Sequence, residues 1–331
     1  MPINKNIKLI LNYFLGPLVF IFLLWSIYHQ ILGQLHWQRS LQQITAAISG
    51  PRGWKFWIVV LLMPVNWGIE ARKWQLAIRP AQRITYFRAF GAVLTGTTMA
   101  SFTPNRMGEY LGRMLYVEEG KRLQSVGLGM ICSMAQLLVT MLTGCLGILA
   151  LQYHLAHQEI WAAPAMHFWL NVLLAAVGFI CLGLATLYFR LSWLVRLVGR
   201  MPIFEKYQVN VKVLQHVDTT ILLEILFLSF TRYLVFIAQY YLMFSVFGVL
   251  LTWSQTFSGI SMMFLVIAAV PTFTFLTELG IRWEASIQII ELYSTNAVGI
   301  FAASLGIWLV NLILPALIGS LLFLSIKLFK K

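Results

Sequence analysis

Acidic residues are scarce in this chain of 331 residues, which has 11 aspartates and glutamates against 24 lysines and arginines. Asp218 is the only aspartate. This excludes metal-diphosphate sites of the Asp-x-Asp and Asp-Asp-x-x-Asp types. Phosphate-binding glycine loops, serine nucleophile motifs and dinucleotide fingerprints are also missing. We expect no metal and no cofactor, and nothing in these patterns favours an enzyme.

Charge of either sign is sparse, since only 11% of the residues are charged while 60% are apolar. This composition excludes a soluble globular domain. Cys132, Cys145 and Cys181 lie inside apolar runs without C-x-x-C spacing, so we expect buried packing residues. The chain is predicted to be an all-α polytopic membrane protein, a single integral membrane domain over residues 1–331. Membrane topology then explains the net charge of +13, and nucleic acid is not an expected partner.

Six apolar runs are long enough to be full transmembrane helices. They are Tyr13–Leu32, Phe56–Ile78, Ser125–Leu151, Phe168–Phe189, Leu222–Phe247 and Ile300–Ser325. The second run is interrupted by Pro64, Asn66 and Glu70. The first follows two lysines in the manner of a signal sequence, but no small-residue cleavage site follows it, so we expect a retained helix.

Two further apolar stretches, Ala89–Phe102 and Phe257–Val270, are too short to cross. Each has 14 residues, about 21 Å as a helix, against roughly 30 Å of hydrocarbon. If both are re-entrant, 19 of the 24 lysines and arginines fall on one side of the membrane and 4 on the other, with Arg232 inside a span. Full crossing would leave 10 inside and 13 outside, against the positive-inside bias. Re-entrant or broken helical segments are therefore predicted, in the cytoplasmic (inner) membrane with both termini cytoplasmic.

The order of two spans, a re-entrant segment and a span then occurs twice, starting from opposite sides. This pattern predicts an inverted-topology repeat over residues 1–151 and 168–331, and such repeats bring their broken helices together near the membrane midplane.

Each short stretch runs into a proline and then into a Glu-x-x-x-Arg pair. Glu109 and Arg113, like Glu278 and Arg282, are four residues apart and share one helix face. One such pair alone would indicate a local ion pair. Its recurrence after two broken helices favours a polar site for a charged headgroup.

Two more arginines are candidate binding residues. Arg106 has no counterpart in the second motif, and its planar fork suits a lipid phosphate, although anchoring at inner-leaflet headgroups is an equal alternative. Arg232 lies near the centre of its span, where a charge costs about 2.5 kcal/mol or more unless it is paired. Glu278 and Glu109 are its expected partners.

Secondary candidates lie close to these residues in the sequence. They are Asn105, Gly108, Glu70, Arg72 and Gly280. Glu70, Arg72 and Lys73 are interpreted first as an interfacial boundary and second as part of the same cavity.

The tryptophans near the second span, Trp67 and Trp74 among them, are expected to be interfacial anchors. The small residues around Gly91 and Gly96 predict close helix packing.

At these motifs the chain resembles the lysylphosphatidylglycerol synthase transmembrane (flippase-like) domain family. Pro104–Arg113 is similar to that family's Pro-x-Arg-x-Gly-Glu-x-x-Arg signature, with Arg113 one position later. Glu278–Ala285 is similar to its Leu-Gly-x-Arg-Glu-x-Ala motif, with Trp283 inserted. Ala302–Pro315 fits its last helix. The soluble aminoacyltransferase domain of larger members is absent here, so synthase activity is not expected.

The resemblance implies a flippase-like protein that binds and translocates a modified or polyprenyl phospholipid headgroup across the cytoplasmic membrane. The expected partners are membrane lipids with an anionic or polyprenyl phosphate headgroup. Two alternatives stay open at this point: a membrane-embedded glycosyl- or phospho-group transferase acting on a lipid-linked substrate, and an ion-coupled transporter of a small solute. A slot open laterally to lipid would favour the flippase, and a closed aqueous vestibule the solute transporter.

Overall fold

The computed structural model describes residues 45–47, 49–156, 164–191, 193, 195, 212–270 and 275–324. All regular secondary structure in these ranges is helical. The expected first span, Tyr13–Leu32, lies outside the described residues, as do both ends of the chain.

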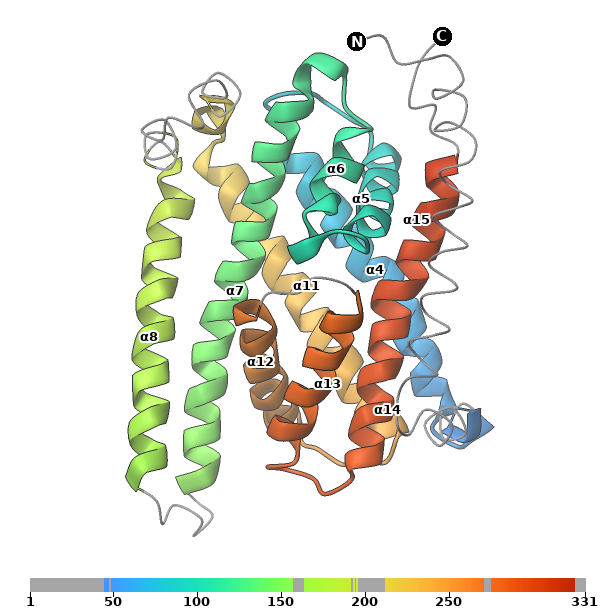
Figure 1. The fold of residues 1–331 in the computed structure, drawn as a ribbon, viewed down its shortest axis with the longest axis vertical. Helices are drawn as coiled ribbons and strands as arrows, with labels where there is room; N and C mark the ends of the chain where they lie inside the picture. The colour runs from blue at the N-terminus through green and yellow to red at the C-terminus, as the bar shows by residue number, and fades with distance from the viewer. Residues whose placement is uncertain are drawn as a thin grey trace.

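Four helical stretches in the described part of the chain are long and apolar enough to cross a membrane: Glu119–Ala156, His167–Phe189, Thr219–Val246 and Ala297–Phe323. They correspond to α7 (Arg122–Ala156), to most of α8 (Pro164–Phe189), to α11 (Thr219–Val246), and to the joined helices α14 (Ala297–Trp308) and α15 (Leu314–Leu324), all drawn in Figure 1. The chain is therefore a multi-pass helical membrane protein.

Helix α4 (Gly53–Ala77) corresponds to the second predicted span. It is 25 residues long, but it carries Lys55, Glu70, Arg72 and Lys73 and is not among the four apolar stretches. Pro64, which interrupts the apolar run in the sequence, is accommodated inside one continuous helix. Helix α4 packs closely along α11.

The first short stretch forms a helical hairpin. Helix α5 (Tyr86–Ala100) begins where the Thr85 side chain accepts a hydrogen bond from the backbone N–H of Arg88, which caps the helix. It is followed by a 3-10 turn, η1 (Pro104–Arg106), and by the return helix α6 (Gly108–Met114).

The second short stretch forms a matching hairpin of α12 (Trp253–Ala269) and α13 (Phe275–Ile290). Thr252 and Gln255 form a capping box that fixes the start of α12. In Figure 1 the α5–α6 pair joins its neighbours at one end of the molecule and the α12–α13 pair at the opposite end, so the two hairpins approach each other near mid-height.

Glycines allow the first hairpin to close tightly. A Cβ atom added at Gly112 would lie 2.5 Å from Cα of Gly96, and one added at Gly108 would lie 2.2 Å from the carbonyl oxygen of Met99. No larger residue fits these positions without moving the backbone, so the close packing predicted around Gly96 is confirmed. Helix α15 also crosses α5 closely, where the Thr98 hydroxyl donates to the carbonyl of Ala316 at 2.7 Å.

Candidate functional site

A cavity of about 530 Å³ lies between the two hairpins. Its charged and amide lining comes from five helices and the η1 turn: Glu70, Lys73, Asn105, Arg106, Glu109, Gln136, Arg232, Glu278 and Arg282. The structure thus brings together most of the residues that the two sequence motifs singled out. Arg113 is the exception: it does not line the cavity, because it is 3% exposed and its side chain pairs with Glu70 and Glu109.

Glu70 on α4 is the centre of the ion pairs in this cavity. Its Oε2 atom lies 2.9 Å from Nζ of Lys73 and 3.0 Å from Nη1 of Arg232, and its Oε1 atom lies 2.8 Å from Nη2 of Arg113. The interpretation of Glu70 and Lys73 as an interfacial boundary is wrong, since both are buried inside the helix bundle. Only Arg72 of that group is exposed, and it bonds Gln75.

The two Glu-x-x-x-Arg motifs form the local pairs expected from their spacing. Arg113 Nη2 donates to Glu109 Oε1 within α6, and Arg282 Nη2 donates to Glu278 Oε1 at 3.0 Å within α13. Both glutamates lie in the first turn of their helices. Arg282 also donates to the hydroxyl of Tyr240 on α11 at 2.9 Å.

Arg106 connects the two hairpins. Its Nε lies 3.8 Å from Oε2 of Glu109, and its Nη1 lies 3.6 Å from Oε1 of Glu278. One guanidinium group therefore lies within ion-pair range of both carboxylates. Asn105 and Arg106 both have positive φ angles, 49° and 58°. This conformation is unfavourable for residues with a Cβ, and such strain is concentrated at functional sites.

Arg232 is the fourteenth of the 28 residues of α11 and is paired as predicted with a carboxylate in the interior. The expected partners, Glu278 and Glu109, are wrong: its Nη1 pairs with Glu70, and its Nε donates to Oδ1 of Asn66 at 2.7 Å. The helix packing explains the difference, because α11 lies along α4.

The guanidinium carbon of Arg232 also lies 5.2 Å from the ring centre of Trp67. Trp67 is therefore buried beside a cation, and the interpretation as an interfacial anchor is wrong for it and for buried Trp74.

Arg232 is connected through Asn66 to a network of buried amide side chains. Asn66 reaches Asn311 at 3.5 Å, and Asn311 donates to Gln239 at 3.0 Å. Asn311 lies in η5 (Leu309–Ile313), a π-helical segment between α14 and α15, and its carbonyl accepts from the Trp67 indole at 3.2 Å. Such widened turns often mark functional sites. This network was not predicted from the sequence, although three amide side chains inside apolar runs were a visible signal.

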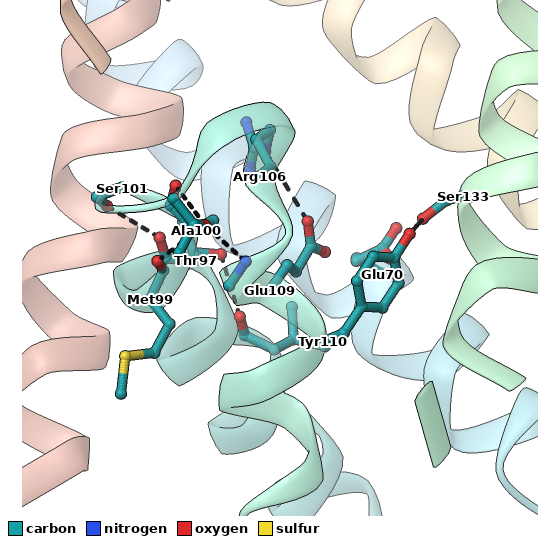
Figure 2. Close-up of polar contacts among 12 residues, drawn as sticks. Glu70, Thr97, Met99, Ala100, Ser101, Arg106, Glu109, Tyr110 and Ser133 are labelled. Carbon is teal, nitrogen blue, oxygen red and sulfur yellow. Dashed lines mark hydrogen bonds and ion pairs between the residues drawn. The ribbon is translucent and has the colours of Figure 1, made fainter. Parts of the chain in front are cut away.

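Figure 2 shows how α6 faces its neighbours at this site. Glu109 extends toward Arg106, Glu70 lies beside it, and the hydroxyl of Tyr110 lies 2.7 Å from that of Ser133 on α7. Nearby, the Gly108 N–H donates to the Thr103 hydroxyl at 2.6 Å. This hydrogen bond stabilises the turn, and it occupies the Gly108 N–H, which is then not available to a ligand.

The remaining sequence candidates have different surroundings. Gly280 has open space where a Cβ would be. Trp283, which is inserted relative to the family motif, packs against Phe301 of α14 with ring centres 4.9 Å apart. Buried Cys132 lines the cavity, and no group of three histidine, cysteine or acidic side chains suited to a metal occurs within the described ranges.

Comparison with known proteins finds no family model, no curated protein and no solved structure that matches this chain. The resemblance carried by the two motifs stays a prediction.

Proposed function

We propose that this chain is a flippase-like membrane protein, which binds a lipid headgroup in the central cavity and translocates it while the acyl chains stay in the bilayer. The observation that carries the proposal is the contrast between the interior of the cavity and its mouth. The interior holds buried ion pairs around Glu70, Glu109 and Glu278. The mouth, the exposed part of the lining, is mostly apolar.

The exposed lining residues identify this mouth: Asn105, Ser133, Ala268, Ala269 and Val270. Ala268 and Ala269 end α12, which stops near mid-height of the molecule in Figure 1, and Val270 follows directly. Ser133 lies on α7, well inside that helix. In the proposed topology this level lies within the hydrocarbon of the membrane. A polar cavity that opens there suits an amphiphile with a charged headgroup, and it favours a lipid over a small soluble solute.

The same proposal assigns the two hairpins as re-entrant segments of an inverted repeat, with six full spans when Tyr13–Leu32 is included. The connection between α4 and α5, which carries Arg79 and Arg83, lies at the end of the molecule where the α5–α6 pair begins. The connection from α6 to α7, which contains the short 3-10 helix η2 (Glu119–Lys121), lies at the same end. The positive-inside bias makes that end cytoplasmic in the cytoplasmic membrane.

Lipid translocation by the full-length protein tests the proposal. Vesicles of phosphatidylethanolamine and phosphatidylglycerol, containing acyl-labelled fluorescent phospholipid, are treated with membrane-impermeant dithionite. We expect the wild-type protein to make the inner-leaflet probe accessible, and the Glu109→Gln and Glu278→Gln variants to slow this strongly.

Glu284→Gln is the matched control, because Glu284 is on α13 like Glu278 but is exposed and pairs with Gln288 at 3.1 Å. It should behave as wild type. Probe accessibility equal to that of protein-free vesicles would reject the proposal. Mass spectrometry of the vesicle lipids separates the transferase alternative, which predicts a chemically altered lipid.

A further inference from the structure

The charges at the cavity form one continuous chain of ion pairs. From Lys73 it passes through Glu70 to Arg113 and Glu109, with Arg232 attached at Glu70. From Glu109 it continues through Arg106 to Glu278 and Arg282.

This chain has more cations than anions. Five basic side chains face three carboxylates, so with all eight ionised the described cluster holds a surplus of two positive charges. Uncompensated charge in a medium of low dielectric is costly, and a bound anion relieves that cost.

Three arginines at the cavity have hydrogen-bonding capacity left over. The Arg106 side chain is 31% exposed, lies only in ion-pair range of its carboxylates, and donates no hydrogen bond to a described residue. Nε of Arg282 is buried without an acceptor. For Arg232, no described residue accepts from Nη2.

These three arginines also line a second, smaller cavity. Its volume is about 60 Å³, and its other walls include Trp67 and Trp308. A space of this size keeps an oxyanion held in it close to the donors of all three arginines.

We infer that Arg106, Arg232 and Arg282 recognise a phosphate group carrying two negative charges, as in a lipid whose headgroup is a phosphate monoester. A monoester supplies up to two negative charges and three acceptor oxygens, which match the charge surplus and the three arginines. A phosphodiester headgroup supplies one charge, and a lysine-modified headgroup is positively charged. This assignment rests on the proposed lipid-binding function and names its headgroup class.

Binding to the purified full-length protein in neutral detergent tests the assignment, measured by isothermal calorimetry. The probes are dioctanoyl phosphatidic acid, dioctanoyl phosphatidylglycerol, lysyl-phosphatidylglycerol, dioctanoylglycerol and inorganic phosphate. At pH 8 we expect the phosphatidic acid to bind roughly tenfold more tightly than the phosphatidylglycerol, the effect of one additional charged hydrogen bond. At pH 5 the ratio should approach one, because the second phosphate proton is then bound.

Two variants test the role of the arginines. Arg106→Gln should lose the preference for the monoester while its melting temperature stays close to wild type, because Arg106 is partly exposed and makes no hydrogen bond to a described residue. Arg72→Gln should keep the preference, because Arg72 is exposed and bonds only Gln75. Retention of the full preference in Arg106→Gln would overturn the inference.

The other probes separate this inference from the proposed function. Equal affinity for the two glycerophospholipids, or tighter binding of the lysine-modified lipid, would overturn the monoester assignment and leave lipid binding intact. Inorganic phosphate binding as tightly as phosphatidic acid would uphold dianion recognition and count against the lipid. Binding of dioctanoylglycerol equal to that of phosphatidic acid would reject any role for phosphate.

Discussion

The Nη1 atom of Arg232 lies 3.0 Å from Oε2 of Glu70, and this ion pair joins α11 to α4 across 162 positions of the chain. Both side chains are largely buried, 13% and 5% exposed. The pair places a cation at the middle of a long apolar helix, where an isolated arginine is strongly disfavoured. Glu70 thereby makes the polar cavity compatible with a membrane interior.

Glu70→Gln should destabilise the protein by about 3–5 kcal/mol, the typical effect of removing one partner from a buried ion pair. Lys73, Arg113 and Arg232 would all lose their shared carboxylate. Thermal unfolding in detergent measures this effect, and Arg72→Gln, two residues away and exposed, is the control. A melting temperature for Glu70→Gln equal to that of the control would contradict the central role of Glu70.

Arg106→Gly and Arg106→Ala remove the same charge but should differ in stability. The φ angle of Arg106 is 58°, a conformation that costs a residue with a Cβ about 1–2 kcal/mol and that glycine adopts freely. The glycine variant should therefore unfold at the higher temperature, while both variants bind phosphate equally weakly. Identical unfolding temperatures would show that this turn relaxes when the side chain is lost.

Gly112→Leu should separate α5 from α6 and destabilise the protein by at least about 1–3 kcal/mol, the usual cost of overpacking. A Cβ at this position already approaches Gly96 within 2.5 Å. Gly183→Leu on α8 is the matched control, because nothing lies within 4 Å of its added Cβ. Unfolding experiments on both variants, followed by circular dichroism, would reveal the difference, and equal stability would refute the tight hairpin.

Single-cysteine labelling tests the sidedness of the hairpins. In a background with Cys132, Cys145 and Cys181 replaced, Gly120→Cys should react with an impermeant maleimide only from the cytoplasmic side. Thr295→Cys, in the exposed loop after α13, should react only from the opposite side. Reaction of both from one side would rule out the inverted repeat.

Local features of this protein could be predicted well from its sequence. The short length of the two apolar stretches, followed by proline, is a local property, and each stretch became a hairpin helix. The Glu-x-x-x-Arg pairing follows from helix geometry alone, because residues four apart share a face. Both pairs form in the structure.

Tertiary structure decided the contacts between distant segments. The sequence contains three acids that a central arginine is able to meet, and only the packing of α4 along α11 selects Glu70 over Glu109 and Glu278 for Arg232. A hydropathy profile also does not reveal the location of Glu70 and Lys73. A charge near the end of an apolar run gives the same profile whether its side chain faces headgroups or the interior of the bundle. The bridge from Arg106 to Glu278 likewise requires the meeting of two hairpins. The amino-acid sequence therefore determined which residues carry charge and which helices stop short, through composition and helical period. Which charges meet was decided by helix packing, because burial and pairing energies depend on neighbours that are remote in the chain.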